Sequence, residues 1–340
     1  MEGFFLYRLP DTSDFKGGTG PIHSGFSAGF IISSFDNSPQ ALLSIEKRGN
    51  FSFHDLIDFQ NAFYQKEVTS YSPARLFPFP SETTSETTHS RNIHTIKDSL
   101  LNGEKTISCT VIKGDDRIDI AASLLSLSTS FPKAFVFCFF TPQSGLWIGA
   151  SPELLLKKDG EELFTMALAG TRPVGLNEEW DSKNLDEQGM VVRYIEDVLN
   201  KYHLLFHHPD TPISKTAGPI EHLCTPFKIK GSGLSPDALS KFLSDFSPTP
   251  ALCGLPKEKA YRLIKESENF SRGYYGGFIG PWQPLGDFSF FVLLRALRIE
   301  KEGWCMYAGG GITKYSEPEA EWMETRRKAS SIIDRIAFIK

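Results

Sequence analysis

The sequence lacks any apolar run that is long enough to cross a bilayer. Its longest apolar runs, such as Ala134–Phe140 and Phe288–Leu294, are far shorter than the about 20 residues that a membrane-spanning helix requires. The first residues, Met1, Glu2 and Gly3, also lack the basic start and the apolar run of a signal peptide. These absences predict a cytoplasmic protein that has no membrane partner.

Cysteine is scarce, and positive charge is not concentrated anywhere along the chain. The five cysteines among the 340 residues are scattered and never in a Cys-x-x-Cys spacing, so neither a disulfide framework nor a zinc site is indicated. A net charge of −5 without a basic stripe argues against a nucleic-acid partner. The chain also has no Walker sequence and no Gly-x-Gly-x-x-Gly segment that leads into a helix, which argues against nucleotide binding.

The residues that are present indicate a folded α+β protein. An apolar content of 40% with 28 phenylalanines supports a sizeable core, and the absence of repeats and linkers predicts one domain over residues 1–340. Antiparallel strands grouped before and after helices favour an α+β fold over a doubly wound parallel sheet. The polar stretch Pro78–Ser90 predicts an exposed loop or a partly disordered link. We predict helices at Phe53–Tyr64, Asn92–Asn102, Asp181–Tyr202, Pro236–Phe246 and Pro256–Phe270, and strands at Lys105–Ile112, Ala134–Thr141, Gly145–Ile148, Glu153–Lys157, Leu163–Ala169, Phe288–Ile299 and Trp304–Ala308.

The segment from Tyr307 to Ile333 predicts a glycine-rich turn followed by a helix. The turn is Gly309–Gly311. The helix opens with Ser316, Pro318 and Glu319, which match a capping box with proline in the first turn. A flexible turn beside a well-defined helix start is a suitable place to bind a small ligand.

Charged side chains on two predicted helices could bind an ion. Glu321, Glu324 and Lys328 are spaced by three and four residues, so they share one face of the last helix. Glu187 lies on the helix predicted over residues 181–202, four residues after Lys183. Each set could also be an ordinary solvated surface pair. Carboxylates that converge from two helices would form a site for magnesium, which binds through few protein carboxylates.

Arg295 lies within the apolar segment Phe288–Ile299, where a guanidinium group needs a partner. Either an edge position in the sheet or a ligand that carries a carboxylate would supply one, because arginine binds that group through two hydrogen bonds. Glycines at Gly170, Gly276 and Gly309 could let backbone amides approach the same anionic ligand.

Eight segments of the chain, in this order, carry a family resemblance. They are SPELLLKKDG, ALAGTRPVG, SKNLDEQGMVV, EHLCTPFKIKG, SPTPALCGLPKEKA, RGYYGGFIGPW, VLLRALRI and YAGGGI with EPEAEWMETRRK. Over roughly residues 92–340 the chain resembles the chorismate-utilising enzymes of menaquinone, siderophore and tryptophan biosynthesis, and residues 1–91 form a variable N-terminal part. Within that family it is most similar to the isochorismate synthases.

This resemblance implies a fold and a reaction. The fold is that of anthranilate synthase component I, with two large antiparallel sheets packed together and helices outside. The reaction is a magnesium-dependent isomerisation of chorismate to isochorismate by a monomer, for menaquinone or siderophore biosynthesis. Lys105 matches the general base that acts on water, and Glu153 matches the general acid that protonates the departing 4-hydroxyl. Glu153 then needs a less polar setting that keeps it protonated.

The resemblance also implies the residues that bind the metal and the substrate. Glu187, Glu321 and Glu324 match the acidic positions around magnesium. His222 matches a histidine of the active-site wall, and a hydrogen-bonded core histidine is an equal alternative. The substrate-binding positions, in which the arginine and the tyrosine match the pair that holds a chorismate carboxylate, are Gly170, Thr171, His222, Leu252, Tyr275, Arg295, Gly309 and Lys328.

Two other functions remain open. Salicylate synthases keep the same lysine and then eliminate pyruvate, whereas a non-catalytic chorismate-binding homologue would need neither Lys105 nor Glu153. Relatives that transfer an amine generally lack this lysine and are disfavoured. The chain departs from the family pattern at Ser247 and Gln188, where histidine is frequent, and at Thr110, where arginine is common.

Overall fold

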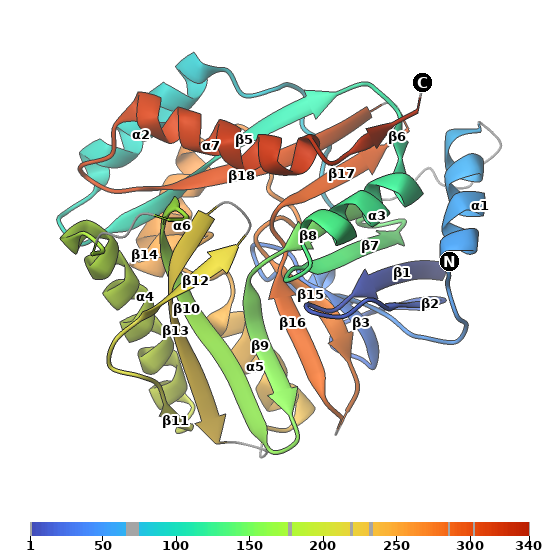
Figure 1. The fold of residues 1–340 in the computed structure, drawn as a ribbon, viewed down its shortest axis with the longest axis horizontal. Helices are drawn as coiled ribbons and strands as arrows, with labels where there is room; N and C mark the ends of the chain where they lie inside the picture. Colours follow the sequence, from blue (N-terminus) through green and yellow to red (C-terminus); the bar gives the residue numbers. More distant parts are fainter. Residues whose placement is uncertain are drawn as a thin grey trace.

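The computed structural model describes residues 2–65, 75–175, 179–217, 220–230, 234–284, 286–301 and 303–339, apart from the side chains of Thr171, Lys183, Ala217 and Ile220. Its strands form two antiparallel sheets that are joined by β2 (Phe15–Ser24), whose first part belongs to one sheet and whose end belongs to the other. Within these residues, the two sheets make one hydrogen-bonded network of 17 strands (Figure 1). The predicted α+β fold is confirmed.

The first sheet places the strand that begins with Lys105 next to the glycine-rich strand. Besides β2 it contains β1 (Glu2–Arg8), β5 (Lys105–Gly114), β7 (Phe135–Thr141), β8 (Gly145–Ser151), β14 (Gly254–Leu255), β17 (Ala296–Glu300) and β18 (Gly303–Ile312). The strand order is β2-β1-β7-β8-β17-β18-β5-β14. Gly311 lies opposite Ile107, and Gly309 lies opposite Cys109. The glycine run therefore belongs to a strand, and the turn predicted there is wrong.

The second sheet carries the segments around Glu153 and Gly170. It contains β3 (Gly29–Ile32), β4 (Leu43–Ile45), β9 (Leu154–Asp159), β10 (Glu162–Pro173), β11 (Leu205–His207), β12 (Ile213–Ala217), β13 (Ile220–Lys230), β15 (Phe278–Trp282) and β16 (Phe288–Val292). Starting from the end of β2, the order is β4-β3-β15-β16-β9-β10-β13, and both β11 and β12 pair with β13. A separate two-stranded sheet joins β6 (Ile118–Asp119) to β19 (Ala337–Phe338).

The chain crosses from one sheet to the other at Arg295, so the single strand predicted over Phe288–Ile299 is wrong. β16 pairs with β9 of the second sheet, whereas β17 pairs with β8 and β18 of the first. Arg295 adopts a φ of +49° between these two strands. Such a left-handed conformation is uncommon for a residue with a side chain. Arg295 therefore lies neither inside a strand nor along a sheet edge.

Helices cover the outer faces of the two sheets. They are α1 (Phe53–Tyr64), α2 (Glu86–Ser99), α3 (Ile120–Ser130), α4 (Ser182–Lys201), α5 (Pro236–Phe246), α6 (Lys257–Ser267) and α7 (Pro318–Ile333), with a short 3-10 helix at Pro39–Ala41. Figure 1 shows α7 running along β18 and α4 running along β10 and β13. None of the helices in the described ranges is long and apolar enough to span a membrane.

Two helix starts differ from the predictions. The helix predicted over residues 92–102 begins earlier, at Glu86, because the Ser85 hydroxyl caps it by accepting a hydrogen bond from the Thr88 amide. The end of the predicted loop is therefore helical. In α7 the N-cap is Glu317, without a side-chain cap, and the Ser316 hydroxyl accepts instead from the Thr313 amide.

Alternating side chains of β7 show how the layers pack. Phe135, Phe137 and Phe139 belong to the core cluster between the two sheets. Val136 and Cys138 point the other way, into the cluster that contains residues of α1, α3 and α7. The rings of Phe135 and Phe291 stack with centroids 4.3 Å apart and so join the first sheet to the second.

Candidate active site

One cavity of about 350 Å³ brings together every predicted site residue except Thr171. Its walls come from β5, β10, β13 and β18, from loops between strands, and from the helices α4 and α7. Thr171 lies in β10, but its side chain is outside the described residues. The predicted residues on the wall are Lys105, Glu153, Gly170, Glu187, His222, Leu252, Tyr275, Arg295, Gly309, Glu321, Glu324 and Lys328.

Glu153 lies just before β9 and is only 9% exposed. Burial raises the pKa of its carboxyl group to about 7, although a hydrogen bond from Thr249 and the charges of Lys105 and Arg295 act in the opposite direction. The Thr249 hydroxyl donates to Glu153 Oε1 at 3.2 Å. A carboxyl group with this pKa keeps its proton in a large share of molecules near neutral pH, so it can act as a general acid.

Lys105 is the first residue of β5, and its buried ammonium group pairs with the carboxylate of Glu187 on α4. The opposite strand leaves room for this side chain because it has a glycine there. A Cβ atom added at Gly311 would lie 2.3 Å from Lys105 Cε. The glycine-rich strand β18 is therefore shaped around the lysine.

The three predicted metal ligands line the same cavity but do not form a ready-made cluster. Among the described residues, no group of three or more histidine, cysteine, aspartate or glutamate side chains is placed to hold a metal ion. Glu187 pairs with Lys105, and Glu324 accepts from Lys328 Nζ at 2.6 Å. Glu321 is buried against β18, where a Cβ added at Gly310 would lie 2.9 Å from its Oε2 atom.

The chemistry of these carboxylates nevertheless suits a divalent cation. Burial alone would raise the pKa of Glu187 and of Glu324, but the charges of Lys105 and Lys328 bring both pKa values below the ordinary value. Both groups are therefore ionised at neutral pH, and a set of carboxylate oxygens is what magnesium prefers. A cation that binds here would compete with Lys105 and Lys328 for the carboxylates of Glu187 and Glu324.

Arg295 presents a positive charge to the cavity. Within the described part of the chain, no side chain or backbone carbonyl accepts a hydrogen bond from its guanidinium group. Burial lowers its pKa, and Tyr275 and Glu153 are the ionisable neighbours that act on it. The Tyr275 ring is buried and stacks on Tyr307 with centroids 5.2 Å apart. An arginine that has no acceptor within the described ranges and lies beside a phenol is suited to bind a carboxylate.

His222 and Gly170 also line the cavity. His222 Nδ1 lies 2.9 Å from the Gly170 carbonyl oxygen, so Nδ1 must carry the proton because a carbonyl can only accept. Burial lowers the pKa of His222, which favours the neutral ring. Gly170 adopts a φ of +61°, and a Cβ there would lie 2.9 Å from Asn184 Oδ1. His222 is therefore both hydrogen-bonded and on the cavity wall, so the two alternatives raised by the sequence are compatible.

The three departures from the family pattern all lie away from the cavity wall. Thr110 is an odd number of residues from Lys105 along β5 and so faces the opposite side of the sheet, where its hydroxyl donates to the Ala308 carbonyl at 3.2 Å. Gln188 Nε2 donates to the Thr225 hydroxyl at 2.8 Å. Ser247 is buried at the end of α5, and its carbonyl accepts from Lys257 Nζ at 2.7 Å.

Sequence reasoning missed several residues that line the cavity or contact a residue that lines it. Thr249 reaches Glu153, and Asp181 and Asn184 line the wall at the start of α4. Asp181 is the N-cap of α4 and accepts from the Asn184 amide at 2.7 Å. The capping position could be predicted from the sequence. The contact between Thr249 and Glu153 could not, because the two residues are far apart along the chain.

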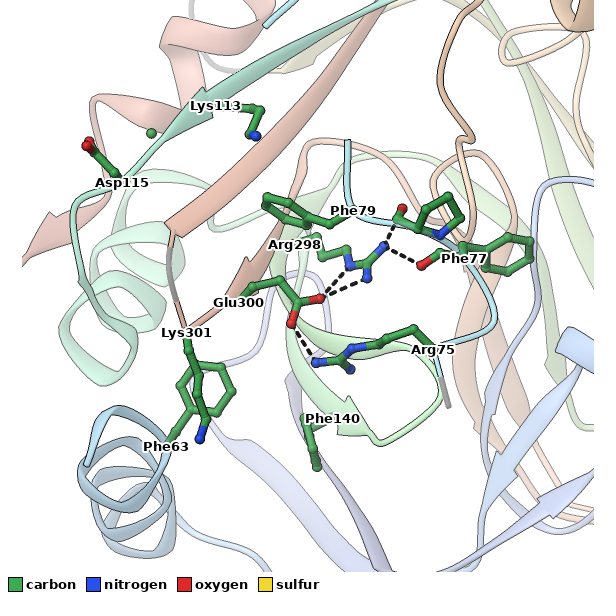
Figure 2. A pocket seen from close by; sticks show the side chains of 12 residues that line it. Phe63, Arg75, Phe77, Phe79, Lys113, Asp115, Phe140, Arg298, Glu300 and Lys301 are labelled. Carbon is green, nitrogen blue, oxygen red and sulfur yellow. Dashed lines mark hydrogen bonds and ion pairs between the residues drawn. The ribbon is translucent and has the colours of Figure 1, made fainter. Parts of the chain in front are cut away.

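A second cavity, of about 800 Å³, contains none of the predicted site residues (Figure 2). Three of its charged groups, Arg75, Arg298 and Glu300, pair with one another. Glu300 accepts from Arg75 Nη2 at 2.6 Å and from Arg298 Nη2 at 2.8 Å. Arg298 Nη1 donates to the carbonyls of Phe77 and Pro78, both at 3.1 Å. Because the smaller cavity holds Glu153, Lys105 and Arg295, which has no hydrogen-bond acceptor among the residues that the structure describes, it is the candidate active site despite its smaller volume.

The chain is similar to a known protein family and to several individual proteins. A family model described as "Chorismate binding enzyme" matches residues 108–337. The vibriobactin-specific isochorismate synthase of Vibrio cholerae serotype O1 is 30% identical over 233 residues, which cover 65% of this chain and 58% of that protein. Isochorismate synthase EntC of Escherichia coli K12 is 31% identical over 233 residues, which cover 66% of this chain and 59% of EntC. The chain thus spans about three-fifths of the length of these relatives.

The fold of this chain is similar to that of a solved isochorismate synthase structure. The menaquinone-specific isochorismate synthase MenF from Escherichia coli superimposes with a TM-score of 0.75 over 98% of this chain and 88% of MenF. At 22% sequence identity, this similarity shows the fold alone. The predicted architecture, with two packed antiparallel sheets and helices outside, is confirmed.

Proposed function

Since the chain belongs to the family of chorismate binding enzymes, we propose that it converts chorismate to isochorismate. It would supply isochorismate for menaquinone or siderophore biosynthesis, the routes for which its relatives are named. One observation carries this proposal. Lys105 and Glu153 line one cavity, and Glu153 is buried so that its pKa rises to about 7.

The proposed reaction needs a base and an acid at separate positions. Water forms a bond to one ring carbon of chorismate while the 4-hydroxyl leaves from another. Lys105 in its neutral amine form, released from Glu187, takes a proton from the attacking water, and protonated Glu153 gives its proton to the departing hydroxyl, which leaves as water. Transfer of one proton from Lys105 back to Glu153 then restores both groups. The number of atoms in the product equals that in the substrate, as an isomerisation requires.

Other residues of the cavity fix the substrate. Arg295 and Tyr275 bind one carboxylate, because arginine offers two parallel donors and has no protein partner within the described residues. Lys328 lies beside them on α7 and donates to the Gly309 carbonyl at 2.9 Å. When bound, magnesium would supply positive charge to a substrate carboxylate, and Glu187, Glu321 and Glu324 would hold it.

Two substitutions test the roles of the base and the acid. Lys105→Gln and Glu153→Gln should each lower isochorismate formation by at least about 100-fold, as expected for loss of a general acid or base. Binding of chorismate, measured by calorimetry, should change much less. Lys228→Gln is a matched control, because Lys228 pairs with Glu162 at 2.8 Å outside the cavity. Full turnover by either active-site variant would contradict the proposed roles.

A further inference from the structure

A buried ion pair lies directly behind the wall of the active-site cavity. Arg272 Nη2 and Nε lie 2.5 and 2.8 Å from the two carboxylate oxygens of Glu268, and both side chains are only 2% exposed. Neither residue lines the active-site cavity. The face of the guanidinium group is covered by the Phe35 ring, at 4.6 Å from its centroid.

This pair completes the hydrogen bonding of β5 along its open edge. β14 pairs only with Lys105 and Thr106 on that edge. Beyond them, the Ile107 carbonyl accepts from Arg272 Nη2 at 2.9 Å, and the Cys109 amide donates to Glu268 Oε1 at 2.9 Å. The two charged side chains therefore act in place of a neighbouring strand.

The same pair reaches two other parts of the wall. Arg272 Nη1 donates to the Leu252 carbonyl at 2.6 Å. The Arg272 carbonyl accepts from the Tyr275 amide at 3.0 Å. Through one guanidinium group and its backbone, the strand of Lys105, the loop of Leu252 and the turn of Tyr275 are held together.

We propose that Arg272 and Glu268 are positioning residues, which set the distance between Lys105 and the residues that hold the substrate carboxylate. Stability does not by itself account for such a pair, since apolar side chains of similar volume are often as stabilising as a buried ion pair. The directional hydrogen bonds that the pair makes to three segments of the cavity wall do account for its presence there. This inference rests on the proposed function, because it assigns these residues a part in the same reaction.

The test compares Arg272→Lys with a matched control from the second cavity. Arg298 is also buried, pairs with Glu300 and donates to two backbone carbonyls (Figure 2). Lysine keeps the charge in both places but lacks the fork that reaches several acceptors. Both variants should therefore lose stability toward urea. Arg272→Lys alone should lower kcat, by roughly 10- to 100-fold, with a change in KM of less than about threefold, because a displacement of about 1 Å has that effect on reacting groups.

The kcat values and hydrogen exchange of variants of the two glutamates, Glu268 and Glu300, provide a second test of the positioning role. Glu268→Gln should lower kcat in the same direction and should speed hydrogen exchange at the Cys109 amide, whereas Glu300→Gln should do neither. Equal kcat values for the Arg272 and Arg298 variants, after correction for the folded fraction, would overturn the inference. If the wild-type protein forms no isochorismate, the proposed function fails first. The positioning role is then decided by hydrogen exchange at the Cys109 and Tyr275 amides, which Arg272→Lys should speed at least tenfold and Arg298→Lys should leave unchanged.

Discussion

Replacing Glu153 with glutamine should make the protein more stable while removing its activity. The pKa of this carboxyl group rises from 4.5 to about 7 because the folded protein buries it. Each pKa unit corresponds to about 1.4 kcal/mol, so an ionised Glu153 lowers the free energy of unfolding by about 3 kcal/mol. Glutamine has nearly the same shape and no charge, so the variant avoids this loss.

The sign of the effect depends on pH. Below pH 4.5 the carboxyl group is protonated in both the folded and the unfolded chain, and wild type and variant should differ little. Between pH 4.5 and about 7 the unfolded chain loses its proton first, so the stability of the wild type falls as the pH rises. Above pH 7 the full difference of about 3 kcal/mol should be present.

Urea unfolding of both proteins at pH 5 and pH 8, without metal, measures this difference. Glu187→Gln is the control with the opposite sign, because the charge of Lys105 keeps the pKa of Glu187 below its ordinary value. That variant should be less stable than wild type at pH 8. The reasoning fails if Glu153→Gln gains no stability relative to wild type between pH 5 and pH 8.

Three further predictions concern Gly311, Lys105 and His89. Gly311→Ala should lower turnover at least tenfold, because its Cβ would lie 2.3 Å from Lys105 Cε, whereas Gly286→Ala, which meets only ordinary contacts, should be active; equal activity would refute the steric reading. Lys105→Gln should tighten magnesium binding about tenfold in calorimetry, since its hydrogen bond to ionised Glu187 contributes roughly 1.5 kcal/mol; unchanged affinity would show that the pair does not compete with the metal. Burial lowers the pKa of His89 to about 4, so its stability contribution is lost as the pH falls from 6.5 toward 4. His89→Leu should therefore resist acid unfolding better than wild type, and an identical acid transition would contradict this.

Local signals in the sequence predicted several elements well. α1 and α5 begin and end at the predicted residues, and Ser52 and Ser235 fix their starts through side-chain hydrogen bonds. α4 begins beside its cap Asp181, as its apolar periodicity indicated. In each case the residues that decide the boundary lie within a few positions of it.

Non-local pairing decided the elements that were predicted wrongly. The apolar segment from Phe288 to Ile299 has the composition of one strand, but its halves pair with different sheets and Arg295 turns the chain between them. The glycine run Gly309–Gly311 has the composition of a turn, yet it is a strand because it pairs with β5. These positions are glycine because Glu321, Cys109 and Lys105 occupy the space that side chains would need. The strands with which these two segments pair are distant along the chain, so the local sequence does not reveal them.

The site itself was predicted mainly through the family resemblance. Spacing alone grouped Glu321 and Glu324 on one helix face, and only the fold brings Glu187 and Lys105 to the same cavity. Arg272 opens one of the segments that carry the family resemblance, but neither Arg272 nor Glu268 was predicted to act in the site, because their importance lies in the wall segments that they join.

Incubation of the purified protein with chorismate and magnesium, with and without a chelator, tests the proposed function most directly. Products are separated by chromatography. We predict isochorismate that forms without release of pyruvate and that disappears when the chelator removes magnesium. Salicylate with an equal amount of pyruvate, or no product at all, would contradict the proposal.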